Sequence, residues 1–219
     1  MDHRAVLARA EPFASFGADD LAAIAAASAE VALERHALVF AEGEAAATLY
    51  VVLRGRVAIA NRSADGRESV MALMEAGDVF GEMSLFDGAG RSAAARAVDR
   101  TTVLEVPYEP VRAAMERQPA VLWSALALLA RRLRSTDEAL ADNVFLDVLG
   151  RTAKRLLELA GDADQFVLPL TQEELAGLVG ASRERVNKAI ATFVRLGWID
   201  QRGRRYRIVA RDELERRAR

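Results

Sequence analysis

Residues 80–94, with the sequence FGEMSLFDGAGRSAA, contain the side chains best suited to bind a small ligand. Glu82 follows a glycine, and Arg91 and Ser92 come nine residues later, with further glycines between them. A carboxylate can accept a hydrogen bond from a ribose hydroxyl, and an Arg–Ser pair with nearby backbone N–H groups can hold a phosphate. Glycine lets the backbone approach a ligand closely. This segment could therefore hold the sugar and phosphate of a cyclic nucleotide, although a solvated surface loop has the same spacing.

The segment resembles the phosphate-binding cassette of the cyclic-nucleotide-binding domains, whose core reads F-G-E-x-x-L followed by R-S/T-A. Residues 80–85 read FGEMSL and residues 91–93 read RSA, so nearly every signature position is filled. The resemblance implies that Glu82 binds the ribose and that Arg91 with Ser92 binds the phosphate. The cassette residues expected to contact the ligand are Gly81, Glu82, Met83, Ser84, Arg91 and Ser92.

The composition limits other kinds of chemistry. The 219 residues include no cysteine, which excludes disulfides, zinc–thiolate sites and cysteine-ligated iron–sulfur clusters. No nucleophile–histidine pair, Gly-Lys phosphate loop or clustered metal-ligand motif is visible, so we do not expect an enzyme. The first ten residues do not resemble a signal peptide, and the most apolar run, residues 121–130, is too short to span a bilayer. We expect a cytoplasmic protein with no membrane partner.

Charge is distributed unevenly along the chain. From residue 151 onward there are 15 Lys or Arg against 10 Asp or Glu, a balance of +5 within a net charge of −2. A basic C-terminal third favours contact with a polyanion such as DNA, although a solvated helical surface can have the same composition.

The residue pattern predicts an α+β protein. Residues 5–31 predict short helices broken at Pro12 and Gly17. Short β-rich runs then alternate with glycines, and Asp65-Gly66 is a strong hairpin signal. Many short strands with regular turns are typical of a β-sandwich or jelly roll. The predicted strands are residues 49–53, 57–60, 69–73 and 102–106.

A long helix is predicted from Pro110 to about Asn143, and its length of about 30 residues corresponds to ~45 Å. Its apolar positions alternate spacings of four and three, as in the seam of a coiled coil. A single helix packed on its own β-domain would show a wider apolar stripe. We therefore expect a homodimer. The seam positions are Leu122, Leu126, Leu129, Leu133, Thr136 and Leu140.

Two short helices joined by a glycine are predicted near the C-terminus, as in a helix-turn-helix motif. Thr171 can cap the first helix in a capping box with Glu174, Gly180 supplies the turn, and Ser182 can cap the second helix. A basic hairpin-like run at residues 201–209 follows and is expected to grip DNA phosphates as a wing. The residues expected on the buried face of the second helix are Val186, Ile190, Phe193 and Val194.

Both signature segments occur in the order found in the superfamily of the cyclic-AMP receptor protein and the fumarate-nitrate regulator, which the chain resembles along nearly its whole length. The resemblance implies a β jelly-roll nucleotide-binding domain at residues 1–109, a dimerisation helix and hinge at 110–143, and a winged helix-turn-helix at 144–219. It also implies that Thr136 and Asp137 contact the base at the dimer interface. Asp137 departs from the family's serine and suits adenine or guanine. Cyclic AMP is the expected ligand, with cyclic GMP or cyclic di-GMP as alternatives.

The second helix of the motif matches the family's recognition helix in the string S-R-E-x-V-x-K/R. The match implies that Arg183 binds guanine and Glu184 accepts from cytosine in palindromic, TGTGA-like half-sites. Lys188, at a position where the family has arginine, is expected at guanine or phosphate, and Arg185 at phosphate. The expected DNA contacts are Thr171, Ser182, Arg183, Glu184, Arg185, Lys188 and Arg204. RNA polymerase is the further partner that the resemblance implies.

Two other interpretations fit parts of the sequence. Because of Asp137, a regulator of the same fold that responds to cyclic di-GMP or to no nucleotide is an alternative interpretation. A nucleotide-binding regulatory module of an enzyme would explain the cassette, but it would not need a helix-turn-helix.

Overall fold

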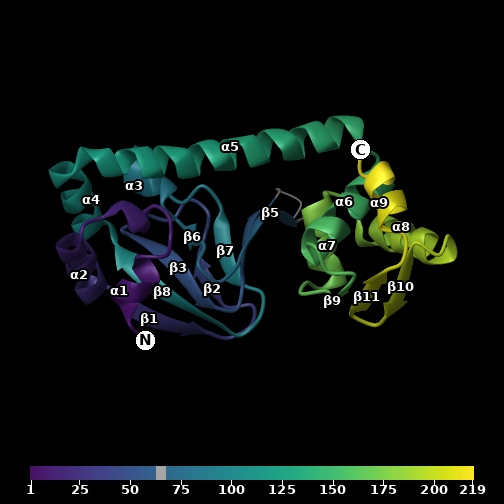
Figure 1. The fold of residues 1–219 in the computed structure, drawn as a ribbon, viewed down its shortest axis with the longest axis horizontal. Helices are drawn as coiled ribbons and strands as arrows, with labels where there is room; N and C mark the ends of the chain where they lie inside the picture. The colour runs from purple at the N-terminus through teal and green to yellow at the C-terminus, as the bar shows by residue number, and fades with distance from the viewer. Residues whose placement is uncertain (63–67) are drawn as a thin grey trace. The chain divides into compact units, whose positions relative to one another are not determined.

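The computed structural model describes residues 1–62 and 68–219, and their contacts divide into two compact units near residue 133. The N-terminal unit contains two four-stranded sheets, with strand orders β1-β8-β3-β6 and β2-β7-β4-β5 (Figure 1). The strands are β1 (Ala29–Leu33), β2 (Leu38–Phe40), β3 (Thr48–Arg54), β4 (Val57–Arg62), β5 (Glu68–Met74), β6 (Val79–Phe80), β7 (Ala94–Ala97) and β8 (Thr101–Pro107). The predicted β-sandwich is therefore confirmed, while the hairpin signal Asp65-Gly66 falls outside the described residues.

Strand β3 illustrates how the sequence forms this sandwich. Successive side chains of a strand point to opposite faces, and both faces of β3 are covered. Leu49 and Val51 pack in a core shared with the N-terminal helices, whereas Tyr50 and Val52 pack in a second core with residues of β2, β4 and β7. A nearly continuous apolar run is expected of a strand that is buried on both sides.

Short helices surround the first of these cores. They are α1 (His3–Leu7), η1 (Phe13–Ser15), α2 (Ala18–Ala27), α3 (Met83–Asp87), α4 (Tyr108–Arg117) and η2 (Pro119–Val121). The predicted helical region of residues 5–31 ends early, because Ala29–Leu33 forms β1 and pairs antiparallel with β8. That pairing is a tertiary contact, and it overrides the helical preference of the alanines.

The predicted continuous helix from Pro110 to Asn143 is two helices. Helix α4 ends at Arg117, Gln118 has φ −130° and ψ 77°, and α5 (Leu122–Phe145) begins after the short η2 turn. Pro119 explains the break, since a proline disfavours the helical conformation of the residue before it. The 24 residues of α5 still contain the whole predicted seam.

The C-terminal unit contains the predicted helix-turn-helix and wing. Its elements are α6 (Val148–Ala160), β9 (Gln165–Val167), α7 (Gln172–Val179), α8 (Arg183–Arg195), β10 (Ile199–Arg202), β11 (Arg205–Ile208) and α9 (Arg211–Arg217). The hydroxyl of Thr171 accepts from the backbone N–H of Glu174 at 3.1 Å, and the Glu174 carboxylate accepts from that of Thr171 at 2.7 Å. Gly180 ends α7 in the left-handed conformation with a φ of 67°. The expected capping box and glycine turn are thus confirmed.

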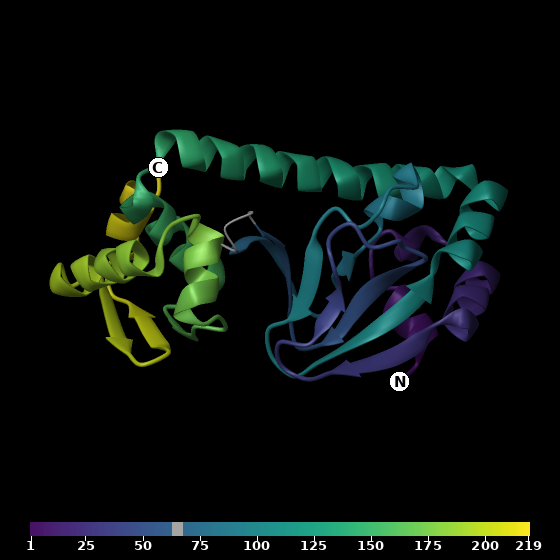
Figure 2. The same cartoon turned by 180° about the vertical axis from the view of Figure 1, so that it is seen from behind.

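Helix α8 lies against β10 (Figure 2). One face of the helix is buried in the core. Val186, Ile190 and Phe193 are buried as expected, but Val194 is 42% exposed and the prediction for it was wrong. Each residue of a helix is rotated by 100° from the previous one, and the buried position beside Val186 and Phe193 belongs to Ala189.

No helix in the described ranges is long and apolar enough to cross a membrane.

Candidate ligand cavity and DNA interface

The six predicted cassette residues line one small cavity of the N-terminal unit. After Phe80, the chain turns at Gly81, whose φ is 77°, and enters α3. A Cβ at Gly81 would lie 2.7 Å from Nη1 of Arg91, so only glycine fits without displacing that side chain. The cavity has a volume of about 60 Å³, and it is lined by Phe40, Ile59, Phe80, Gly81, Glu82, Met83, Ser84, Arg91, Ser92, Ala93 and Arg132.

Arg91 is almost completely buried beside this cavity, with 5% of its surface exposed. Its Nη1 donates to the carbonyl oxygen of Gly81 at 2.9 Å and to the hydroxyl of Tyr108 at 3.1 Å. The guanidinium carbon lies 4.0 Å from the centre of the Phe40 ring, a cation–π contact. Its Nε is buried and has no hydrogen-bond partner among the described residues. A buried donor therefore remains available to an anionic group in the cavity.

Glu82 is also buried, with 1% exposure, and it is held by an arginine of α5. Nη1 of Arg132 donates to Oε1 of Glu82, and Nη2 of Arg132 donates to the carbonyl oxygen of Val79. Oε2 of Glu82 is buried and accepts no hydrogen bond within the described part of the chain. The cavity thus has one unused acceptor as well as one unused donor.

These two unused atoms are unusual, because nearly all buried polar groups in native proteins form hydrogen bonds. A buried donor or acceptor without a partner costs about 1–3 kcal/mol. A ligand with an anionic group and a neighbouring hydroxyl would satisfy Nε of Arg91 and Oε2 of Glu82 together. A cavity of about 60 Å³ is far smaller than the ~300 Å³ of small ligand sites, so entry requires lining side chains to move.

The serines and the methionine of the cassette differ in how accessible their side chains are. Ser84 is 6% exposed, and its hydroxyl donates to the carbonyl oxygen of Gly90 at 3.3 Å. The hydroxyl of Ser92 lies 3.4 Å from the sulfur of Met83, and both residues are exposed. Ser92 can therefore offer its side chain to a ligand, whereas the hydroxyl of Ser84 is already used within the cassette.

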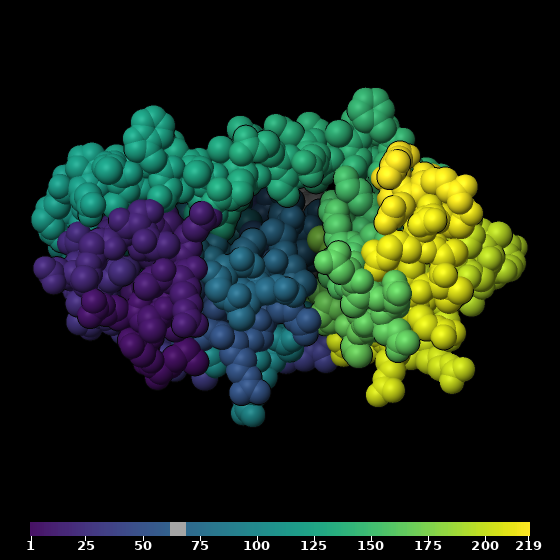
Figure 3. Space-filling view, in the orientation of Figure 1, coloured from purple at the N-terminus to yellow at the C-terminus, as the bar shows by residue number. Residues whose placement is uncertain are grey.

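Thr136 and Asp137 lie on α5 within the C-terminal unit, and both are exposed. The same helix exposes four leucines of the predicted seam and leaves Leu129 half-buried, and Figure 3 shows side chains of α5 at the surface along its length. Leu126, Leu133 and Leu140 are 53%, 62% and 65% exposed. A row of exposed leucines is typical of an interaction surface.

The recognition helix α8 exposes the predicted DNA contacts at its N-terminal end. The hydroxyl of Ser182 caps the helix by accepting from the N–H of Arg185 at 3.4 Å. Nζ of Lys188 lies 2.7 Å from Oε1 of Glu184, and this hydrogen bond lowers the pKa of the Glu184 carboxyl. Arg183 is exposed next to this pair. The helix end thus presents the hydrogen-bond donors of the Arg183 guanidinium beside the Lys188 donor and the Glu184 acceptor. Donors and acceptors in this combination can distinguish base edges in the major groove.

Two other predicted DNA contacts already have intramolecular partners. Arg204 donates from Nε and Nη2 to the carbonyl oxygen of Leu168 at 3.1 and 2.9 Å, and Nη2 also lies 2.9 Å from the carbonyl oxygen of Pro169. The hydroxyl of Thr171 caps α7. Arg204 therefore holds the wing to the segment before α7, while Arg202 and Arg205 of the wing are exposed.

Sequence reasoning did not identify Arg132 or the hinge contacts of Arg151. In the C-terminal unit, Arg151 of α6 donates to the carbonyl oxygen of Leu146 at 2.7 Å and to that of Val179 at 2.9 Å. One guanidinium therefore connects the end of α5 with the turn of the helix-turn-helix. For Arg132, the available signal was its position one helical turn before Thr136, which puts both on the same face of α5.

Comparison with known proteins agrees with this arrangement. Residues 30–118 match the family profile of the cyclic nucleotide-binding domain, and residues 150–217 match that of the Crp-like helix-turn-helix domain. A "CRP-like cAMP-activated global transcriptional regulator" of Mycobacterium tuberculosis is 41% identical over 98% of this chain and 99% of its own length. The "cAMP-activated global transcriptional regulator CRP" of Escherichia coli is 36% identical over 68% of this chain and 74% of its own.

A solved structure from Xanthomonas campestris has the same fold. It is described as the "c-di-GMP Responsive Global Regulator CLP", and it superposes with a TM-score of 0.76 at 27% identity, covering 88% of this chain and 99% of that one. Proteins similar to this chain are thus described as responding to different nucleotides: cyclic AMP for the two curated relatives and cyclic di-GMP for the Xanthomonas structure.

Proposed function

This chain belongs to the CRP/FNR family of DNA-binding transcription regulators, and we propose that cyclic AMP is the ligand that controls its binding to DNA. The observation that carries the proposal is the pair of unused buried atoms, Nε of Arg91 and Oε2 of Glu82, in one cavity. A cyclic nucleotide has a phosphate for the first and a ribose hydroxyl for the second. Charge-assisted hydrogen bonds of this kind are about twice as strong as neutral ones.

In this proposal, the phosphate binds Arg91 and Ser92, and the ribose binds Glu82. Backbone N–H groups of the segment from Gly81 to Ser84 complete the phosphate site. Arg132 stays close to Glu82 and neutralises its charge, which matters because an unpaired buried carboxylate is costly. The base contacts Thr136 and Asp137 at the interface of a homodimer whose seam is the row of exposed leucines on α5.

The proposed regulation acts through the ends of α5. A ligand shifts an equilibrium only by its differential affinity for the two states. A change from 1:99 to 99:1 requires about 5.5 kcal/mol, which two identical sites would share. Arg151 provides a direct connection for such a shift, because it joins the end of α5 to the turn that precedes the recognition helix.

At the DNA, we infer that the two recognition helices of the dimer enter successive major grooves of a palindromic site. Arg183 binds guanine, Glu184 accepts from cytosine, and Lys188 contacts guanine or phosphate. Arg185 and the wing bind phosphates. The proposal includes RNA polymerase as a partner, a cytoplasmic location, and the domains 1–109, 110–143 and 144–219.

A guanine nucleotide is the second candidate ligand, and Asp137 is the residue that favours it. A carboxylate accepts two hydrogen bonds, which suits N1–H and the amino group of guanine. The Xanthomonas structure described as responsive to cyclic di-GMP has the same fold at 27% identity. Asp137→Ser would then move the preference toward cyclic AMP.

Calorimetric titration of the purified dimer with cyclic AMP, cyclic GMP and cyclic di-GMP tests the ligand. We expect cyclic AMP to bind with micromolar or tighter affinity and the other two to bind at least about tenfold more weakly, a difference of about 1.4 kcal/mol. Preferential binding of a guanine nucleotide would support the second candidate. Binding of none of the three would contradict the proposal that a cyclic nucleotide controls this regulator.

A further inference from the structure

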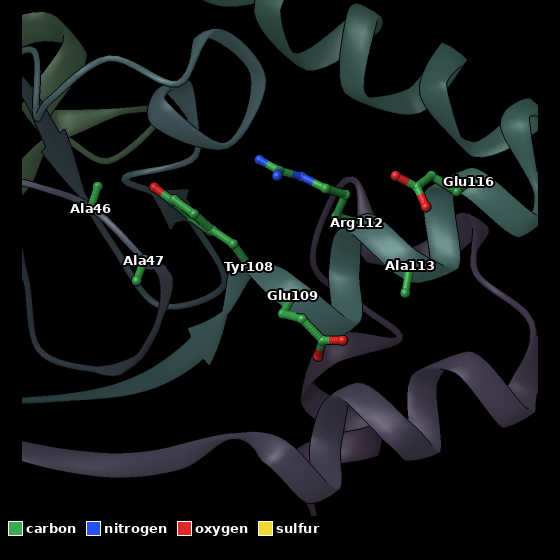
Figure 4. Close-up of a pocket in the computed structure, with 7 residues that line it drawn as sticks. All are labelled: Ala46, Ala47, Tyr108, Glu109, Arg112, Ala113 and Glu116. Atoms are coloured by element: carbon green, nitrogen blue, oxygen red, sulfur yellow. The ribbon is translucent and has the colours of Figure 1, made fainter.

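Helix α4 forms one wall of a groove whose lining includes two side chains that contact the cassette. The groove has a volume of about 400 Å³ and is lined by Ala46, Ala47, Tyr108, Glu109, Arg112, Ala113 and Glu116. Figure 4 shows the side chains of Tyr108 and Arg112 extending in the same direction from successive turns of α4. These two side chains reach the backbone of the cassette.

Tyr108 contacts the cassette just before α3, and Arg112 contacts the middle of α3. The hydroxyl of Tyr108 donates to the carbonyl oxygen of Gly81 and accepts from Nη1 of Arg91. Nη2 of Arg112 donates to the carbonyl oxygen of Leu85 at 3.2 Å. Residues four apart lie on the same face of a helix. One face of α4 is therefore hydrogen-bonded to both the start and the middle of the turn that follows β6.

The two contacts are not equally strong. Tyr108 is 7% exposed, and burial raises the pKa of its hydroxyl, so the group remains protonated and able to donate. Arg112 is exposed, and water competes for its donors. The contact of Tyr108 with the Arg91 guanidinium is therefore the stronger connection.

We propose that Tyr108 is a positioning residue for Arg91 and that, with Arg112, it transmits phosphate binding from the cassette to α4. The inference rests on the proposed binding of a cyclic nucleotide. Nη1 of Arg91 is shared between Gly81 and Tyr108, so a phosphate that engages the guanidinium changes the position or occupancy of both hydrogen bonds. Tyr108 is the first residue of α4, and α4 leads through Gln118 and η2 into α5. The cassette thus acts on α4 through hydrogen bonds as well as through the core.

Hydrogen exchange of the full-length protein, with and without saturating cyclic AMP, tests this connection at the level of segments. In the wild type, we expect the ligand to slow exchange in residues 81–92 and also in residues 108–117. In the double variant Tyr108→Phe/Arg112→Gln, we expect the cassette to remain protected at saturation and the response of α4 to be lost. Tyr108→Phe alone should weaken cyclic AMP binding by about tenfold, as one hydrogen bond to the guanidinium is removed.

Arg117→Gln is the matched control, because Arg117 lies on the same helix but pairs with Asp20 of α2 at 2.6 Å. This variant should respond to the ligand as the wild type does. A response of α4 in the double variant equal to that of the wild type would overturn the inference, as would a wild type whose cassette is protected while α4 is unchanged. Absence of any protection in the cassette of the wild type would instead contradict the proposed function, and the inference with it.

Discussion

Replacing Arg91 with leucine should weaken the binding of cyclic AMP by at least about 100-fold. Arg91 is the buried cation of the cavity, and its Nε has no other partner among the described residues. The variant removes one or two charge-assisted hydrogen bonds to the phosphate, each worth about 1.5–3 kcal/mol. It also leaves the phosphate charge beside an apolar side chain, which adds a cost of desolvation. Calorimetric titration of the variant dimer measures the loss.

The comparison must separate binding from folding, because Arg91 also donates to Gly81 and Tyr108. Arg91→Lys keeps the charge but lacks the planar fork, so its affinity should fall between those of the wild type and Arg91→Leu. Arg100→Leu is the surface control, since Arg100 is exposed and pairs with exposed Glu34 at 3.1 Å. Thermal unfolding should confirm that each variant is folded. Unchanged affinity in a folded Arg91→Leu variant would show that the cassette does not bind a phosphate.

The second large effect is expected at the DNA. Arg183→Ala should weaken binding to a palindromic site by about 1–3 kcal/mol for each half-site, because the guanidinium forms two hydrogen bonds with one guanine. Its effect on DNA of unrelated sequence should be much smaller, since phosphate contacts supply most of the non-specific affinity. Fluorescence anisotropy with labelled duplexes at fixed salt concentration measures both affinities.

Arg195→Ala provides the control on the same helix. Arg195 lies in the last turn of α8, at the end opposite to the residues that reach base edges. Its replacement should leave the specificity ratio of the palindrome over unrelated DNA unchanged. If Arg183→Ala weakened binding to every duplex equally, Arg183 would be a phosphate contact and the base assignment would be wrong.

Local signals explain why much of the fold and both candidate sites could be predicted. The capping box of Thr171 and Glu174 and the glycine at 180 are short-range features, and the structure contains them as expected. The cassette residues likewise stand within a dozen positions of one another, and they line one cavity. Strand β3 was recognisable from its nearly continuous apolar run, whose side chains pack alternately in two cores.

The features that could not be predicted depend on residues distant in sequence. Arg132 and Tyr108 contact cassette residues that are 50 and 27 positions away. Nothing in the neighbourhood of Tyr108 indicates its contact, and the signal for Arg132 was limited to its helical spacing from Thr136. Strand β7, with the sequence AARA, has little intrinsic preference for a strand and owes its conformation to pairing with β2 and β4. The break at Gln118 was foreseeable from Pro119, but the sequence analysis predicted a single helix from Pro110 to about Asn143.

The measurement that tests the account most directly is binding of a fluorescent palindromic duplex by the purified protein, with and without cyclic AMP. We expect saturating cyclic AMP to increase the affinity for the palindrome at least about tenfold, a coupling free energy of ~1.4 kcal/mol, within the range typical of allosteric sites. A duplex with a single half-site should bind much more weakly, because only one recognition helix then contacts its bases. Equal affinity with and without cyclic AMP would contradict the claim that this nucleotide controls the regulator.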